Sequence, residues 1–434
     1  MENNNQTINQ KKLMEPTIAF VGMTHLGLIS AVAASEKGFQ VLCLDPDQNL
    51  IDSLKNTVPF ISEPQLIELM HKNRERLTFT SDFKMLHKSA VIYVAPDVST
   101  NDQGQSDLSN LNNLLNTVLI SSARDNVIVV LSQVPPGFTR SKLTKDRSIF
   151  YQVETLIFGQ AINRALYPER YIIGSLNPAE ELPKPYRLFL ELHDCPILVM
   201  RYESAELAKI SINMCLVSSV TTANTLAELC EEIGADWSEI APALRLDKRI
   251  GQYAYLSPGL GISGGNLERD LATVVNYAEQ FSTDYGVINA WISNSKRRKN
   301  WIWKTFQKVI HKNGNPSLIG VLGLTYKENT HSLKNSPALE FLSHVSSCNI
   351  VAYDPKAAME ATPNYVKRAQ SIHEALSGVE ILVVSTAWPE FGAITVSMLL
   401  QYMAGRVVID PYGIFNKNLL IENGFTYHTL GASF

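Results

Sequence analysis

The sequence has few cysteines, and those it has lie far apart. They are Cys43, Cys195, Cys215, Cys230 and Cys348, and no two of them form a CxxC or CxxxC pair. Disulfide frameworks and zinc sites need ligands grouped in space, which closely spaced cysteines would signal. We therefore predict no metal site, interpret each cysteine as a small buried apolar residue, and expect the protein in the reducing cytoplasm.

Long apolar runs and clusters of positive charge are also missing. No segment approaches the roughly 20 apolar residues of a membrane-spanning helix, and the polar start MENNNQTINQKK lacks the apolar core of a signal peptide. The net charge is −4, with acidic and basic residues interspersed, whereas binding nucleic-acid phosphates needs clustered positive charge. We predict no membrane and no nucleic acid as partner, and interpret residues 1 to 14 as a flexible tail.

What the first part of the chain does contain is short apolar runs alternating with helical patterns. Continuous apolar runs, typical of parallel strands buried on both faces, occur at residues 17–22, 40–45, 91–95 and 127–132. Helical patterns lie between them, at 26–37 and 108–122. Strands and helices in this order predict a doubly wound α/β sheet, which we place in a domain at residues 15–200.

The middle of the chain is helical, and a second alternating region follows it. Residues 204–234 and 267–312 are nearly free of glycine and proline, and long helices with apolar residues on several faces usually bury one against a partner subunit. Further strands are predicted at 318–323, 349–354, 381–385 and 407–410. We predict an α/β fold with two Rossmann-like doubly wound domains, the second at 313–434, joined by a long-helix central domain at 201–312 that forms a homodimer.

A glycine-rich turn follows the first predicted strand. Gly22 and Gly27 hold the first and third positions of the G-x-G-x-x-G pattern that binds dinucleotides, and Thr24 holds the second, where its Cβ would crowd the diphosphate. Asp45 ends the next strand, where a carboxylate bonds the adenosine ribose and disfavours a 2′-phosphate. Gly22, Gly27 and Asp45 predict binding of NAD rather than NADP. Thr24 is counted with them as a cofactor-binding residue because the helix N-terminus still offers N–H donors there. The alternative is a turn in a fold that has lost its cofactor.

Segments along nearly the whole chain carry a further set of motifs. They are 58–64, 101–108, 132–139, 205–213, 247–251, 323–327, 336–337, 353–355 and 386–388. In this order they resemble the motifs of the UDP-glucose/GDP-mannose dehydrogenase family. The resemblance implies an N-terminal NAD domain, a central dimerising helix, a C-terminal domain for the nucleotide sugar, and NAD-dependent oxidation of a sugar C6 alcohol to the carboxylate in two steps.

The resemblance also assigns roles to single residues. Lys209 and Asn213, four residues apart and therefore on one face of a helix, match a pair that stabilises negative charge on the substrate oxygen; without the family they could be a polar stripe. Glu154 and Asp270 match further catalytic positions. The remaining matches are positions expected to bind the nucleotide sugar, namely Arg249, Gly264, Tyr326 and Lys327.

Several catalytic positions of the family pattern are occupied by other residue types. The family has G-F-G-G-x-C-x-P-K-D where this chain has 261–270, and counting back from Asp270 places Asn266 at the nucleophilic cysteine. Phe158 replaces the glutamate that serves hydrolysis, and Gln133 replaces a threonine that holds water. Other differences are Asp97 and Val98 in place of a Thr-Pro pair near the nicotinamide, and Tyr412 and Gly413 where an arginine is expected near the nucleotide.

Three hypotheses follow from these residues. An amide is not a nucleophile, so Asn266 cannot form the covalent intermediate of the second oxidation; we expect a single two-electron hydride transfer on a nucleotide sugar. A full four-electron 6-dehydrogenase would need an unfamiliar nucleophile. A non-catalytic relative that binds a nucleotide sugar or a partner protein is the third hypothesis, favoured by Thr24 and Tyr412 and opposed by the retained Lys209 and Asn213.

Overall fold

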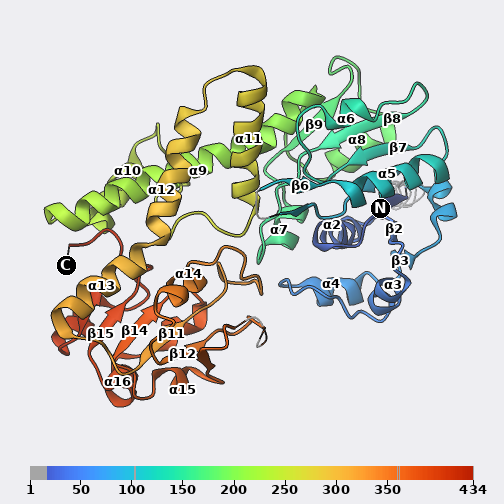
Figure 1. Ribbon diagram of the computed structural model, residues 1–434. Coiled ribbons are helices and arrows are strands. Elements are labelled where there is room, and N and C mark those ends of the chain that lie inside the picture. The colour runs from blue at the N-terminus through green and yellow to red at the C-terminus, as the bar shows by residue number, and fades with distance from the viewer. Residues whose placement is uncertain (1–16, 102–103, 359, 361, 434) are drawn as a thin grey trace, which may run out of the picture. The chain divides into compact units, whose positions relative to one another are not determined.

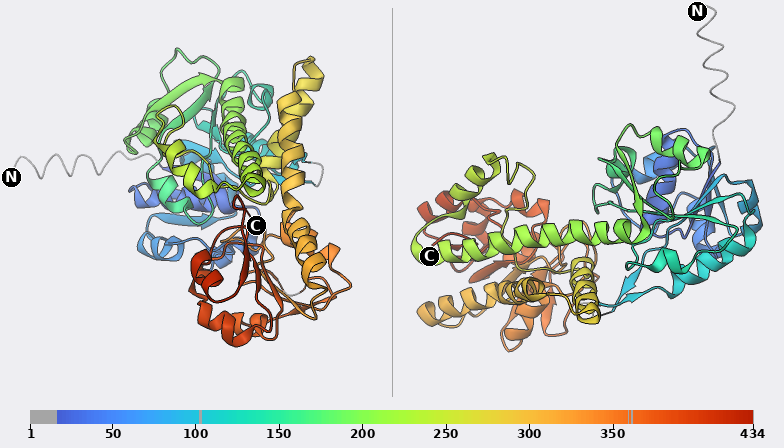
Figure 2. Two further views of the ribbon diagram at one scale, coloured as in Figure 1. Left: turned by 90° about the vertical axis from the view of Figure 1, so that its left-hand side faces the viewer. Right: turned by 90° about the horizontal axis from the view of Figure 1, so that it is seen from above.

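A computed structural model describes residues 17–101, 104–358, 360 and 362–433 (Figure 1). The predicted flexible tail, residues 1 to 14, lies outside the described residues. The described chain divides into two compact units. One contains the residues up to Asn101 together with Ser106–Ser211, and the other contains Ile212 onward. The division falls inside α9 (Tyr202–Ile233), which is one continuous helix (Figure 2).

The first unit is built on an eight-stranded sheet of order β10-β9-β8-β7-β4-β1-β2-β3. Its strands are β1 (Ile18–Val21), β2 (Val41–Leu44), β3 (Leu77–Thr80), β4 (Val91–Val94), β7 (Val127–Val130), β8 (Ser148–Gln152), β9 (Tyr171–Ser175) and β10 (Ile197–Arg201). They pair in parallel except for β8 and β9, which are antiparallel. A separate small hairpin pairs β5 (Ser99–Thr100) with β6 (Ser106–Asp107). The chain order reverses at β1, which pairs with both β2 and β4, and ligands of doubly wound sheets bind at the carboxyl ends of such strands.

The helices of the first unit connect these strands. They are α2 (His25–Glu36), α3 (Gln48–Lys55), α4 (Leu66–Lys72), α5 (Ser109–Ser121), α6 (Phe138–Ser141), α7 (Ala161–Leu166) and α8 (Lys184–Glu191). Ten of the twelve residues of α2 are buried, as expected for a helix that is apolar on all sides. Gly27 lets α2 approach β1, because a Cβ there would lie 1.9 Å from the carbonyl oxygen of Gly22.

The second unit contains a six-stranded sheet of order β13-β12-β11-β14-β15-β16, with every pair parallel. Its strands are β11 (Ile319–Leu322), β12 (Ile350–Tyr353), β13 (Val366–Arg368), β14 (Ile381–Val384), β15 (Val407–Ile409) and β16 (Thr426–His428). Strand residues alternate between two apolar clusters: Ile381 and Val383 belong to one, and Leu382 and Val384 to the other. The covering helices include α14 (Pro337–His344), α15 (Ile372–Leu376), α16 (Val396–Tyr402) and α17 (Lys417–Glu422). The predicted pair of doubly wound domains with a helical centre is confirmed.

The helical centre groups with the second sheet. Its helices after α9 are α10 (Trp237–Leu246), α11 (Asn266–Phe281), α12 (Gly286–Lys299) and α13 (Trp301–Asn313). The segment 267–312, predicted as continuous helix, contains three helices. The first ends where Ser282 adopts a left-handed conformation (φ 56°), and Asn300 separates α12 from α13. The domain bounds 15–200, 201–312 and 313–434 stay a prediction. No helix in the described part of the chain has the length and apolar character of a membrane span.

Candidate active site

The turn between β1 and α2 places the predicted cofactor residues at the carboxyl end of the first sheet. Gly22 adopts φ 94°, and a Cβ there would lie 2.8 Å from the nitrogen of Pro96, so only glycine fits. Asp45 is buried at the end of β2, where its carboxylate accepts the backbone N–H of Met23 (2.8 Å) and of Asp47 (3.0 Å). A carboxylate offers about four acceptor positions, so capacity remains for ribose hydroxyls. This end of the turn fits the adenosine half of NAD.

Thr24 connects this turn to the residues that follow β4. It is the N-cap of α2, yet its hydroxyl makes no bond to the helix itself. The hydroxyl instead accepts the backbone N–H of Asp97 (2.8 Å) and donates to the carbonyl of Ala95 (3.3 Å). The Asp97 carboxylate in turn accepts the backbone N–H of His25, the first residue of α2, at 3.0 Å. Partial burial raises the pKa of Asp97, while the neighbouring His25 and the N–H bonds partly lower it.

Phe158, which the sequence analysis aligns with the hydrolytic glutamate, packs on the predicted cofactor turn. Its ring centroid lies 4.2 Å from that of His25. The Nε2 atom of His25 lies 2.9 Å from an oxygen of the buried Glu63 carboxylate, and Glu63 also accepts the backbone N–H of Gly159 at 2.9 and 3.0 Å. The sequence motif that contains Glu63 therefore fixes the loop after Phe158. An apolar ring at this position supplies no base for activating water.

Lys209 and Glu154 form a partly buried pair in the first unit. The ammonium of Lys209, on α9, donates to the backbone carbonyl of Glu154 at 2.8 Å and lies 3.6 Å from its carboxylate. The side chains are 13% and 18% exposed. The Glu154 carboxylate also accepts the backbone N–H of Leu156. The structure thus brings together two of the predicted catalytic residues, which lie 55 positions apart in the sequence.

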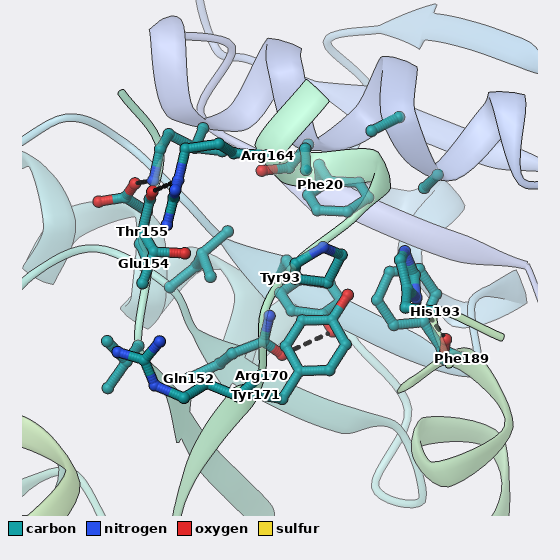
Figure 3. Close-up of a pocket in the computed structure, with 18 residues that line it drawn as sticks. Phe20, Tyr93, Gln152, Glu154, Thr155, Arg164, Arg170, Tyr171, Phe189 and His193 are labelled. Atoms are coloured by element: carbon teal, nitrogen blue, oxygen red, sulfur yellow. Dashed lines mark hydrogen bonds between the residues drawn. The ribbon is translucent and has the colours of Figure 1, made fainter. Parts of the chain in front are cut away.

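A small cavity lies beside the segment that carries Glu154 (Figure 3). Its volume is about 60 Å³. Since one water needs about 10–15 Å³, the cavity has room for a few waters and is too small for a nucleotide. Arg164 donates to the carbonyl of Thr155 at 2.7 Å, and Gln152 accepts the hydroxyl of Tyr93 at 3.0 Å. Burial lowers the pKa of His193, on another wall, to about 4. We interpret these residues as the support that holds the Glu154 segment in place.

Asn213 and Asp270 form a second buried pair, in the second unit. Asn213 lies one helical turn after Lys209 on α9, and its amide donates to the Asp270 carboxylate at 2.5 Å. Asp270 is 1% exposed and also lies 3.4 Å from the guanidinium of Arg269. An amide nitrogen carries two hydrogens, so the bond to Asp270 uses one N–H of Asn213 and leaves the other. That this second N–H contacts a substrate oxygen, with Asp270 as the positioning residue, stays a prediction.

The glycine turn before α11 places Asn266 at the start of a helix. Gly264 (φ 91°) and Gly265 (φ 97°) both adopt conformations that favour glycine. A Cβ at Gly264 would lie 2.3 Å from the ring of Tyr326, so the turn lies directly on that ring. Burial raises the pKa of Tyr326 to about 12. Asn266 is the exposed first residue of α11, a place where a cysteine thiolate would be stabilised but where an amide has no nucleophilic electron pair to offer.

Lys334 is a candidate that the sequence analysis missed. Its Cδ lies 3.5 Å from the Cβ position of Gly265, and its backbone carbonyl accepts the N–H of Gly264 at 3.3 Å. The predicted Lys327 lies 5.8 Å from the ring centroid of Tyr326. The sequence does place Lys334 between the predicted Lys327 and the Ser336–Pro337 motif. Spacing alone, however, cannot show that Lys334 folds back onto the glycine turn.

Arg249 lies apart from these contacts. Its side chain is 89% exposed, and its guanidinium donates to the carboxylate of Asp247, two residues earlier, at 2.6 Å. Its donors are therefore directed at Asp247 rather than at Tyr326 or Lys327. The assignment of Arg249 to the substrate stays a prediction.

Comparisons with known proteins agree with this arrangement. Residues 16–193, 203–296 and 320–417 match the NAD binding, central and UDP binding domains of the UDP-glucose/GDP-mannose dehydrogenase family. UDP-glucose 6-dehydrogenase TuaD of Bacillus subtilis (strain 168) is 30% identical over 95% of this chain and 93% of its own, and the UDP-glucose 6-dehydrogenase of Rickettsia felis is 28% identical over 96% of each.

Solved structures of similar proteins show the same fold. A UDP-glucose dehydrogenase from Pyrobaculum islandicum superposes with a TM-score of 0.82 at 23% identity, covering 97% of this chain and 98% of its own. The UDP-D-ManNAc dehydrogenase from Pyrococcus horikoshii gives 0.81 at 23% identity, covering 96% and 99%.

Proposed function

Because this chain belongs to the UDP-glucose/GDP-mannose dehydrogenase family, whose members are NAD-dependent nucleotide-sugar oxidoreductases, we propose that it transfers a single hydride per nucleotide-sugar molecule. The observation that carries this proposal is Asn266. It begins α11 directly after the Gly264–Gly265 turn, the position at which the family pattern has its nucleophilic cysteine. Without a thiolate no thiohemiacetal forms, and the second oxidation lacks its covalent intermediate.

The remaining groups are sufficient for one oxidation. Lys209 and Asn213 lie four residues apart on α9, and N–H donors at this spacing converge on one substrate oxygen. NAD, when bound, accepts the hydride from the carbon. The proton of the substrate hydroxyl passes to a base, and Glu154, whose carboxylate lies 3.6 Å from Lys209, is positioned to take it. Asp270 holds the Asn213 amide in the orientation that this requires.

Hydrolysis of a covalent intermediate would also lack its water-activating group. Phe158 presents an aromatic ring, packed on His25, at the position of the glutamate that serves this step. A general base must lie within hydrogen-bond reach of the water it activates, and a phenyl ring accepts no proton. We therefore propose that the product is a carbonyl compound and that no carboxylate forms.

The product identifies the reaction. The purified protein is incubated with NAD, hydroxylamine and a panel of nucleotide sugars that includes UDP-glucose, and products are identified by mass spectrometry. We expect the oxime of a nucleotide sugar that has lost one pair of hydrogens. A uronate formed in comparable amount would contradict the single transfer.

We propose further that the protein is a homodimer formed through α9. Leu226, Leu229 and Ile233 lie on one face of this helix and are 40%, 51% and 65% exposed. Leu246, which ends α10, is 85% exposed. Contiguous exposed apolar residues of this kind mark protein–protein interfaces.

The solution mass tests the dimer. Light scattering after gel filtration is expected to give twice the 48.3 kDa of one chain, and Leu229→Glu is expected to give the mass of a single chain because it buries a charge in the interface. Ile120→Glu is the matched control, since Ile120 is 85% exposed on α5 in the first unit. A parent protein of 48.3 kDa would refute the dimer.

A further inference from the structure

Two hydrogen bonds tie the start of α2 to Asp97 reciprocally. The backbone N–H of Asp97 donates to the Thr24 hydroxyl (2.8 Å), and the backbone N–H of His25 donates to the Asp97 carboxylate (3.0 Å). This is the pattern of a capping box, but its two halves lie about seventy residues apart in the sequence. The Thr24 hydroxyl bonds to Asp97 and makes no bond to the helix itself. The backbone N–H groups at the start of α2 are therefore available to the Asp97 carboxylate.

The carboxylate occupies a position that favours anions. The first N–H groups of a helix have no partner within it, and the helix dipole adds a partial positive charge there. The first turn of α2 contains no acidic residue of its own, so Asp97 supplies the negative charge from another segment. In dinucleotide-binding folds this helix terminus binds the diphosphate of the cofactor.

We propose that Asp97 acts as an internal anion that occupies the diphosphate position at the N-terminus of α2, so that NAD binds only when the carboxylate turns away. Two anions cannot share the N–H of His25, and two like charges brought about 4 Å apart repel each other. This inference rests on the proposed function in one respect, namely that NAD is the cofactor and that its diphosphate binds at the N-terminus of α2. It does not depend on whether one hydride or two are transferred.

The surrounding contacts allow such a rotation. Asp97 holds Thr24 through its backbone N–H, which stays in place when the side chain rotates. Asp97 as a whole is exposed, although its carboxylate packs on the helix terminus, so rotation of the side chain would carry the carboxylate into water. The adjacent His25 ring is held separately by Glu63 at 2.9 Å, so the turn keeps its shape while the N–H of His25 becomes available.

The experiment compares the affinities of three ligands. NAD, ADP and adenosine are titrated into the full-length protein and into Asp97→Asn and Asp97→Ala by calorimetry. Both variants are expected to bind NAD and ADP about tenfold or more tightly, because a competing charge is removed. Adenosine, which has no phosphate, is expected to bind all forms equally. Loss of the cap is expected to lower the melting temperature by about 2–4 °C.

Asp82→Asn is the matched control. Asp82 is an exposed aspartate of the same unit that caps a short helix, η1 (Phe83–Lys88), by accepting the N–H of Lys84 at 3.0 Å. Its removal changes the net charge equally and should leave all three affinities unchanged. The proposal is overturned if neither Asp97 variant binds NAD and ADP more tightly than the parent, or if adenosine or the Asp82 variant shows the same gain. If the single-hydride proposal fails, the reaction product will be a uronate, whereas the affinities of the Asp97 variants relative to the parent protein will not change.

Discussion

Lys209→Met is expected to lower kcat by about a thousandfold, the order found when a preorganised donor to a developing oxyanion is removed. The ammonium of Lys209 is 13% exposed and is held by the backbone carbonyl of Glu154, so neither water nor another lysine replaces it easily. Methionine keeps the length of the side chain and its apolar packing. Initial rates of NADH formation with the accepted nucleotide sugar measure the effect.

The affinity for NAD should be nearly unchanged in the same variant. The predicted cofactor residues Gly22, Thr24 and Asp45 lie at the carboxyl ends of β1 and β2, and none of them has Lys209 as a hydrogen-bond partner in the bonds that the structure shows for them. Lys184→Met, which replaces an exposed lysine on α8, is the matched control and should keep full activity. A kcat for Lys209→Met within a fewfold of the parent value would remove Lys209 from the mechanism.

Glu231→Ala is expected to lower the free energy of unfolding by about 3 kcal/mol, the low end of the cost of removing one partner of a buried ion pair, because Arg298 keeps Glu228 at 3.7 Å. Arg298, on α12, is 1% exposed and lies 3.1 Å from the Glu231 carboxylate. The same carboxylate accepts the indole N–H of Trp301 (3.0 Å) and the backbone N–H of Gly431 (3.0 Å). Three donors from three segments of the second unit would lose their acceptor together.

The adjacent residue provides the control for this prediction. Glu232 is 67% exposed and lies 3.5 Å from Lys308, and exposed pairs of this kind contribute about 0–1 kcal/mol. Urea unfolding of both alanine variants, followed by tryptophan fluorescence, should show a large loss for Glu231→Ala and almost none for Glu232→Ala. Equal losses would contradict the role of the buried network.

Four strands of each sheet could be predicted because their signals are local. β1, β2, β4 and β7 are continuous apolar runs, and all their residues are buried. The strands β3, β8, β9 and β10 of the first sheet and β13 and β16 of the second were not predicted. β10, for example, has residues that are only partly buried, and its apolar signal is weak. The break at Ser282 was also missed, because a serine in the left-handed conformation has no sequence signature comparable to glycine.

Spacing alone could predict only those parts of the candidate site whose residues are near one another in sequence, such as the Gly22–Gly27 turn and the Lys209–Asn213 pair. The more distant Glu154 and Asp270 were predicted from the family resemblance. The bond between Asp97 and the start of α2 and the position of Lys334 beside Gly265 could be predicted from neither. They depend on how separate segments pack, which periodicity and spacing do not report.

The number of NADH molecules formed per nucleotide sugar consumed tests the central claim most directly. NADH is followed by its absorbance, and the remaining sugar is quantified by chromatography after the reaction is complete. The absence of a nucleophile at Asn266 and of a base at Phe158 predicts a ratio of one. A ratio of two would show that the second oxidation proceeds without the cysteine, and would contradict the proposed single transfer.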